Sequence, residues 1–149
     1  MGACLMEMKI DSYIKEQFGI KEVDIKTYSP LTLAYIGDGI CDLVIRSVIV
    51  GKCNTKASQL HYQTSHIVKA QSQAMMIEAL EEELTEEEAD VYRRGRNAKS
   101  PTMAKNATMA DYRKATGFEA LMGYLYLTDK FPRIIELTKL GLERARITI

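Results

Sequence analysis

The sequence of 149 residues predicts an all-α fold. Apolar residues recur at helical spacing through several long stretches, and no stretch shows the sustained alternation of a β-strand. The connections between these stretches are short, as they are in helical bundles. The length fits a single domain over residues 1–149, and the composition, 46% hydrophobic and 27% charged, is that of an ordinary globular protein.

Six helices are predicted, after a start at residues 1–10 that carries no usable pattern and is expected to be frayed. Their expected ranges are 11–18, 30–50, 55–80, 86–97, 111–128 and 131–146. Ser29 and Pro30 are typical of an N-cap and a first helical turn, and Gly51 is expected at the C′ position of the same helix. A connector is expected over residues 21–28.

The middle helices carry boundary signals of their own. Asn54 or Thr55 can cap the helix over 55–80, which is long enough to predict a bend or break near 64–65. Thr85 and Glu88 have the S/T-x-x-E spacing of a capping box. Residues 99–108 contain Ser-Pro and no apolar periodicity, so we expect a loop there.

The sequence also indicates in which cellular compartment the protein is found and which metal sites it can form. Its longest apolar run is far shorter than the roughly 20 residues of a membrane span. No signal-peptide pattern is present at the N-terminus, which predicts a cytoplasmic protein. Cys4, Cys41 and Cys53 are odd in number and have no CxxC spacing, so we expect free thiols rather than a zinc site.

Asp38 is a carboxylate inside an apolar helical run, with Asp42 on the same face one turn later. Burying an ionised carboxylate without a partner is costly, so a cation, a metal ion or a cleft is expected beside it. The flanking Gly37 and Gly39 leave room for a second backbone or a ligand. The alternative is a carboxylate at a helix boundary that faces water.

Glu119 lies in a second helix that is apolar almost all round, with Gly117 before it and Gly123 on its own face. Two such helices can approach closely and bring their carboxylates together. Oxygen ligands from facing helices suit Mg²⁺ or Mn²⁺, with water and a substrate phosphate completing the shell. The alternative for Glu119 is a salt bridge in the core to Arg46 or Lys114.

Charge is separated along the chain although the formal net charge is zero. Seven acids lie in residues 81–90, whereas residues 91–114 hold seven bases and one acid. Such an excess can neutralise several phosphates, which points to a nucleic-acid partner, although a solvated basic loop is the alternative. Neither histidine, His61 or His66, lies in a recognisable metal or nucleophile motif, and no phosphate-binding loop is present.

Three segments, in the right order, resemble the ribonuclease III family. Residues 33–38 (LAYIGD) resemble its E-F-L-G-D helix, and residues 118–127 (FEALMGYLYL) are similar to its later F-E-A-x-I-G-A-x-Y motif. Residues 94–99 (RGRNAK) resemble a segment of the short bacterial branch, Mini-ribonuclease III. The resemblance extends over about residues 31–140.

The resemblance implies a ribonuclease III endonuclease-domain-like helical bundle that forms a homodimer. It implies Mg²⁺-dependent cleavage of double-stranded RNA, with Mn²⁺ able to substitute, giving 5′-phosphate and 3′-hydroxyl ends. Asp38 takes the position of the catalytic aspartate and Glu119 that of the metal-binding glutamate. In the short branch it implies maturation of the large-subunit (23S) ribosomal RNA precursor, with a ribosomal protein presenting the substrate.

Two positions depart from the family pattern, because Ala34 and Thr116 stand where the family has acids. Either the metal shell is thinner, or Asp42 contributes directly or through water. The loss of both acids leaves an alternative function, a non-catalytic helical RNA-binding or assembly module. No double-stranded-RNA-binding domain follows in this sequence, so affinity is expected from the basic stretch. The expected RNA contacts are Arg94, Arg96, Asn97, Lys99 and Lys105.

Overall fold

The computed structural model describes residues 9–99 and 108–149, which contain helices and no strand. The helices are α2 (Ile10–Gln17), α3 (Pro30–Lys52), α4 (Ala57–Val68), α5 (Ala70–Leu80), α6 (Glu86–Asn97), α7 (Met109–Leu127) and α8 (Phe131–Arg144), with short 3-10 turns η1 (Ile25–Thr27) and η2 (Glu81–Glu83). The predicted all-α class is confirmed. In this part of the chain, no helix combines the length and the hydropathy needed to cross a membrane.

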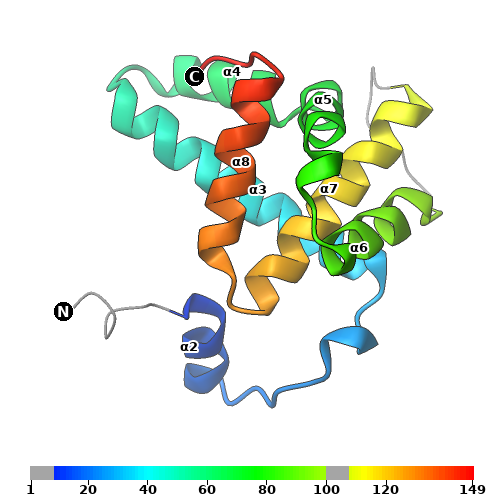
Figure 1. Ribbon diagram of the computed structural model, residues 1–149. Coiled ribbons are helices and arrows are strands. Elements are labelled where there is room, and N and C mark those ends of the chain that lie inside the picture. The colour runs from blue at the N-terminus through cyan, green and yellow to red at the C-terminus, as the bar shows by residue number, and fades with distance from the viewer. Residues whose placement is uncertain (1–8, 100–107) are drawn as a thin grey trace.

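Helix α7 is the centre of the fold. It contacts α3 most extensively, then α6 and α5, and it contributes the largest share of the buried core. Leu121, Met122 and Leu125 of α7 are fully buried against Ile134 and Leu137 of α8. Figure 1 shows α3 and α7 crossing in the middle of the molecule, while α2 lies at the edge away from the C-terminus.

Helix α3 begins as predicted but is less buried than predicted. The hydroxyl of Ser29 accepts a hydrogen bond from the backbone N–H of Thr32, at 3.2 Å. The helix continues through Gly51 to Lys52, because its C-cap, Cys53, leaves in an extended conformation that needs no glycine. Apolar residues at helical spacing predict a largely buried helix over 30–50, and this prediction is wrong because one face stays exposed. That face includes Tyr35 (83% exposed), Leu43 (52%) and Val50 (59%).

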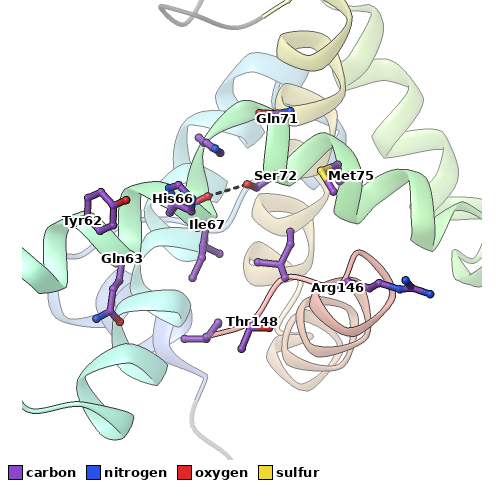
Figure 2. A pocket seen from close by; sticks show the side chains of 12 residues that line it. Tyr62, Gln63, His66, Ile67, Gln71, Ser72, Met75, Arg146 and Thr148 are labelled. Carbon is purple, nitrogen blue, oxygen red and sulfur yellow. Dashed lines mark hydrogen bonds between the residues drawn. The ribbon is translucent and has the colours of Figure 1, made fainter.

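The predicted helix over 55–80 is two helices, α4 and α5, and the break falls at Lys69 rather than at 64–65. Lys69 is extended, and the hydroxyl of Ser72 donates to the backbone carbonyl of His66 at 2.8 Å across the break (Figure 2). No glycine or proline marks this site, so packing decides it. Met75, expected in the core, is 44% exposed.

The predicted start of the helix over 55–80 is also wrong. Helix α4 begins at Ala57 with Lys56 as its N-cap residue and no side-chain cap, so neither Asn54 nor Thr55 caps it. Helix α8 ends at Arg144, two residues before the expected end, and Arg146 turns the chain with a φ of 58°.

The capping box at the start of α6 is confirmed. The hydroxyl of Thr85 accepts from the backbone N–H of Glu88 at 3.1 Å, and the Glu88 carboxylate accepts from the N–H of Thr85 at 2.9 Å. The same carboxylate is buried and receives two hydrogen bonds from the Arg133 guanidinium. Helix α7 begins at Met109, at the end of the expected loop, most of which lies outside the described residues.

Candidate active site

Helices α3 and α7 meet backbone to backbone at two glycines. A Cβ atom at Gly37 would lie 1.7 Å from the carbonyl oxygen of Glu119, and one at Gly123 would lie 2.0 Å from the carbonyl oxygen of Leu33. No side chain fits at either position, so the close approach expected from the sequence is present. This close contact of the two helices brings Asp38 of α3 and Glu119 of α7 together.

The carboxyl groups of Asp38 and Glu119 lie within hydrogen-bonding distance of each other. Burial, followed by the hydrogen bond and the negative charge of Asp38, raises the pKa of Glu119 to about 9. Two carboxylates this close cannot both stay charged without a cation, so the pair holds a proton when no cation is bound. Asp38 is exposed and Glu119 half-buried, which leaves the pair open to solvent on one side.

The alternative that Glu119 is a salt-bridged core acid is wrong. Arg46 instead binds Asp42, with 2.8 Å between Nε and Oδ2, and Lys114 binds Glu78, with 2.6 Å between Nζ and Oε1. Asp42 therefore uses its carboxylate on a surface ion pair one turn away. Its role beside the metal ion stays a prediction.

Two side chains that the sequence analysis missed complete the surroundings of Glu119. Gln73 on α5 is 3% exposed, and its amide lowers the pKa of Glu119, against the larger raising effects of burial and Asp38. Cys41 on α3 is buried, and burial, together with the charges of Glu119, Asp38 and Asp42, holds its pKa well above the usual value. The thiol therefore stays protonated. A glutamine in the apolar stripe of α5 was the available signal for Gln73.

The donor chemistry of the pair suits a hard divalent cation. Mg²⁺ in enzymes is commonly held by one or two carboxylates, with waters and substrate phosphates as the other ligands. Asp38 and Glu119 supply two such carboxylates at one opening. In the described residues there is no cluster of three or more His, Cys, Asp or Glu side chains that could hold a metal, so the protein's share of the ligands would be these two.

Three of the predicted RNA-contact residues, Arg94, Arg96 and Asn97, lie on the last turns of α6, which packs against α7. Gly95 packs against α7, where an added Cβ would lie 2.7 Å from the Cβ of Ala120 and 2.9 Å from the Cα of Gly117. Arg94, Asn97 and Lys99 are exposed, and the Arg96 guanidinium lies 5.5 Å from the centre of the Tyr92 ring. Lys105 lies outside the described residues.

Not every base counted in the basic stretch is available to a ligand. Arg93 pairs with Asp90 on the same helix, and Lys114 pairs with Glu78. At the two positions where the family has acids, one residue is apolar and the hydroxyl of the other is hydrogen-bonded within its own helix. Ala34 lies in a buried cluster with Leu33, Val91 and Ala120, and the hydroxyl of Thr116 donates to the carbonyl of Tyr112 at 2.9 Å.

Figure 2 shows a hollow of about 520 Å³, and neither Asp38 nor Glu119 lines it. That hollow lies between α4, α5 and the C-terminal residues, and its lining includes Tyr62, His66 and Arg146. The rings of Tyr62 and His66 stack there, with 5.6 Å between their centres. The two carboxyl groups belong instead to the crossing of α3 and α7.

Comparison with known proteins decides the family. The Ribonuclease III domain profile matches residues 31–130, a range that includes both carboxylates. Mini-ribonuclease 3 of Clostridium tetani is 45% identical over 129 residues, which cover 86% of this chain and 84% of that protein. Mini-ribonuclease 3 of Enterococcus faecalis is 50% identical over 116 residues, covering 76% and 88%. The chain belongs to the ribonuclease III family.

Membership of the ribonuclease III family makes this protein an endoribonuclease, and the family acts on double-stranded RNA. The fold agrees, since the crystal structure of protein FN1578 from Fusobacterium nucleatum matches with a TM-score of 0.74. That match has 28% sequence identity and covers 82% of this chain and 94% of the other. The ribonuclease III resemblance inferred from the three sequence motifs is confirmed.

Proposed function

We propose that this ribonuclease III protein uses Asp38 and Glu119 to bind Mg²⁺, and that it cleaves the stem that encloses the large-subunit (23S) ribosomal RNA precursor. The observation that carries the proposal is the pair of carboxyl groups held together by the glycine crossing of α3 and α7. A like-charged pair is unfavourable unless a proton or a cation joins it. Relatives named Mini-ribonuclease 3, at 45% and 50% identity, support membership of the short branch, and the ribosomal substrate is what the resemblance to that branch implies.

Mg²⁺, or Mn²⁺ in its place, would be held by the carboxylates of Asp38 and Glu119. When bound, such a cation supplies charge stabilisation to a phosphodiester undergoing hydrolysis. The chain's own contribution is geometric: Gly37 and Gly123 fix the distance between the helices, and the buried flank of Glu119 excludes water from one side of the pair. The exposed flank, on Asp38, is where the RNA backbone would enter.

RNA would be held by the exposed end of α6. A-form RNA is recognised mainly through its phosphates and 2′-hydroxyl groups, so exposed cations and amides beside the carboxylates suit it. Arg94, Asn97 and Lys99 are exposed and Arg96 is half-buried, and Gly95 fixes the position of this end of α6 relative to α7. Lys105 is proposed as a further RNA contact.

The proposal includes a homodimer. Tyr35, on the exposed face of α3, is 83% exposed although it lies three residues before Asp38. A large aromatic side chain left in water next to the carboxylates suits burial against a second copy. Tyr35→Lys is expected to shift the protein to the monomer, as measured by sedimentation velocity. A ribosomal protein that presents the substrate is part of the same proposal, and a ribosomal substrate entails a cytoplasmic location.

The test is cleavage of a long double-stranded RNA and of a ribosomal precursor stem, each with Mg²⁺ or EDTA. The wild type is expected to cut both in Mg²⁺ and to prefer the precursor stem. Asp38→Asn is expected to lower the cleavage rate about a thousandfold while RNA binding is kept. Glu143→Gln, an exposed acid on α8, is the matched control. Binding without Mg²⁺-dependent cleavage by the wild type would favour the non-catalytic module.

A further inference from the structure

Tyr92 of α6 is a buried aromatic residue that lies directly against the backbone of α7. It is 3% exposed. A Cβ atom at Gly117 would lie 2.7 Å from Cδ1 and 2.8 Å from Cε1 of the Tyr92 ring, and 2.7 Å from the backbone oxygen of the same residue. No side chain fits between the two, so the ring fixes the end of α6 against the part of α7 that carries Glu119 two residues later.

The aromatic ring of Tyr92, rather than its hydroxyl group, is the part that the fold uses. The hydroxyl oxygen is buried, and within residues 9–99 and 108–149 it has no hydrogen-bond partner. A buried hydroxyl without a partner is unfavourable, whereas a buried ring contributes packing and an electron-rich face. What this position requires is therefore the ring.

Arg96 lies over the ring of Tyr92, one helical turn later. Its guanidinium carbon is 5.5 Å from the centre of the ring, within the range of a cation–π contact. Its Nε donates to Oδ1 of Asn97 at 3.4 Å. No carboxylate of the described residues pairs with Arg96, whereas the neighbouring Arg93 pairs with Asp90. Arg96 is thus a cation held by neutral groups, and its charge is available to an anion.

Such an arginine suits a phosphate group. The guanidinium is planar and can donate two parallel hydrogen bonds to phosphate oxygens. A long side chain that is already held in place loses less conformational entropy when it binds. Because the Tyr92 ring contacts both Arg96 and Gly117, it also sets where this cation lies relative to Glu119.

We propose that Tyr92 is a positioning residue, which holds the guanidinium of Arg96 ready for an RNA phosphate at a fixed place relative to Glu119. The proposal rests on the RNA surface proposed above. Asn97 assists by accepting from Nε, which leaves the terminal nitrogens of the guanidinium for the phosphate. Arg94 lies on the same end of α6 but is exposed, and among the described residues it has no comparable ring contact.

The test is the affinity for a long double-stranded RNA in EDTA, at several salt concentrations. Arg96→Gln is expected to weaken binding about tenfold and to lower the slope of the salt dependence by about one. Tyr92→Leu is expected to weaken binding by about three- to fivefold when Arg96 is present, and by less than about twofold in the Arg96→Gln background. Tyr92→Phe keeps the ring and is expected to restore binding. Tyr13→Leu, at an exposed tyrosine on α2, is the matched control.

Equal weakening by Tyr92→Leu in both backgrounds would overturn the role of Tyr92, because a general loss of packing does not depend on Arg96. Wild-type binding by Tyr92→Leu, with weakened binding by Arg96→Gln, would overturn it too and would leave the RNA surface intact. Wild-type binding by Arg96→Gln would overturn the contribution of Arg96 to that surface together with the role of Tyr92.

A measurement on the unmodified protein covers the case in which Tyr92→Leu fails to fold. In the RNA-free wild type, the Nε–H group of Arg96 is expected to have a higher NMR order parameter than that of Arg94, because a ring and an amide oxygen hold it. Arg94 serves as the control within the same helix. Equal order parameters for the two side chains would show that Arg96 is not held before RNA binds, and would overturn the proposal.

Discussion

Two glutamates sit in partly or wholly buried positions of this fold and have opposite surroundings. Glu88, at the start of α6, receives hydrogen bonds from the guanidinium of Arg133 at 2.8 and 2.9 Å and from the backbone of Thr85. Glu119, in the middle of α7, faces the carboxyl group of Asp38 and a neutral amide. The first carboxylate has its counter-charge inside the chain, and the second does not.

The pKa values record this difference. Burial raises the pKa of Glu88, but the hydrogen bonds from Arg133 and Thr85 outweigh burial and leave that pKa below its usual value. Burial and Asp38 raise the pKa of Glu119 to about 9. A buried carboxylate whose charge is fully paired is part of the folded structure. A carboxylate that faces another carboxylate is unfavourable, and a bound ligand can remove that repulsion. The contrast predicts opposite responses to the same substitution.

Glutamate-to-glutamine substitution at the two positions is expected to give the largest and most distinct effects. Glu119→Gln is expected to lower the rate of RNA cleavage about a thousandfold, because it removes a charge that the reaction requires. Glu88→Gln is expected to leave cleavage within a few-fold and to lower the free energy of unfolding by about 3 kcal/mol, because Arg133 loses its partner. The measurements are single-turnover cleavage in Mg²⁺ and urea unfolding in EDTA.

A loss of stability in both variants, with cleavage kept in both, would contradict the predicted difference between Glu88 and Glu119. Glu119 would then be one more structural acid, as Glu88 is.

The glycine crossing offers the next largest effect. Gly37→Ala places a methyl group against the backbone of α7, so the free energy of unfolding is expected to fall by about 2–3 kcal/mol. Cleavage is expected to fall as well, since the carboxylates are moved apart. Gly39→Ala is the matched control, because a Cβ there meets nothing within 4 Å. It is expected to stabilise α3 by about 0.5–1 kcal/mol.

Equal unfolding free energies for the two alanine variants would show that the helices are not in contact at Gly37. Urea titration in EDTA at one pH measures both.

The smallest expected effect is the pH dependence of the metal-free protein. Between the usual glutamate pKa of 4.5 and the value of about 9 in the fold, the folded state binds more protons at Glu119 than the unfolded state does. The free energy of unfolding therefore falls as pH rises through this window. Glu88 acts in the opposite sense, since its contribution is present above its usual pKa and is lost as pH falls through its lowered value.

The wild type in EDTA is expected to lose about 1–2 kcal/mol more than Glu119→Gln between about pH 6 and about pH 8. Urea unfolding of both proteins at the two pH values measures this difference. Parallel curves for the two proteins would mean that Glu119 is charged throughout in the absence of metal.

The sequence was sufficient for the features that depend on local signals. The cap at Ser29, the capping box at Thr85 and the acids beside Gly37 and Gly123 could all be inferred, because each depends on residue type at a fixed spacing. The three motifs shared with the ribonuclease III family were sufficient to predict the family. The pairing of Asp38 with Glu119 was an expectation of the same kind, since two apolar helices with glycines can approach closely.

What the sequence did not reveal depends on packing between helices. The break at Lys69 has no glycine or proline, so no local signal in the sequence marks it. The exposed face of α3 looked buried because its residues are apolar, although Tyr35 and Leu43 face outward. The ion pair of Asp42 with Arg46 was not predicted, although the two residues are one helical turn apart.

The order of the helices along the chain has a consequence for how the protein is made. Asp38 lies on α3, but its partner lies on α7, the penultimate helix described, so the pair forms only after most of the chain has been synthesised. Domains fold as their segments emerge, and contacts between distant segments come last. The ribosome that makes this nuclease is itself largely RNA. The nuclease therefore lacks its assembled pair of acids for nearly the whole time that its chain remains attached to the ribosome.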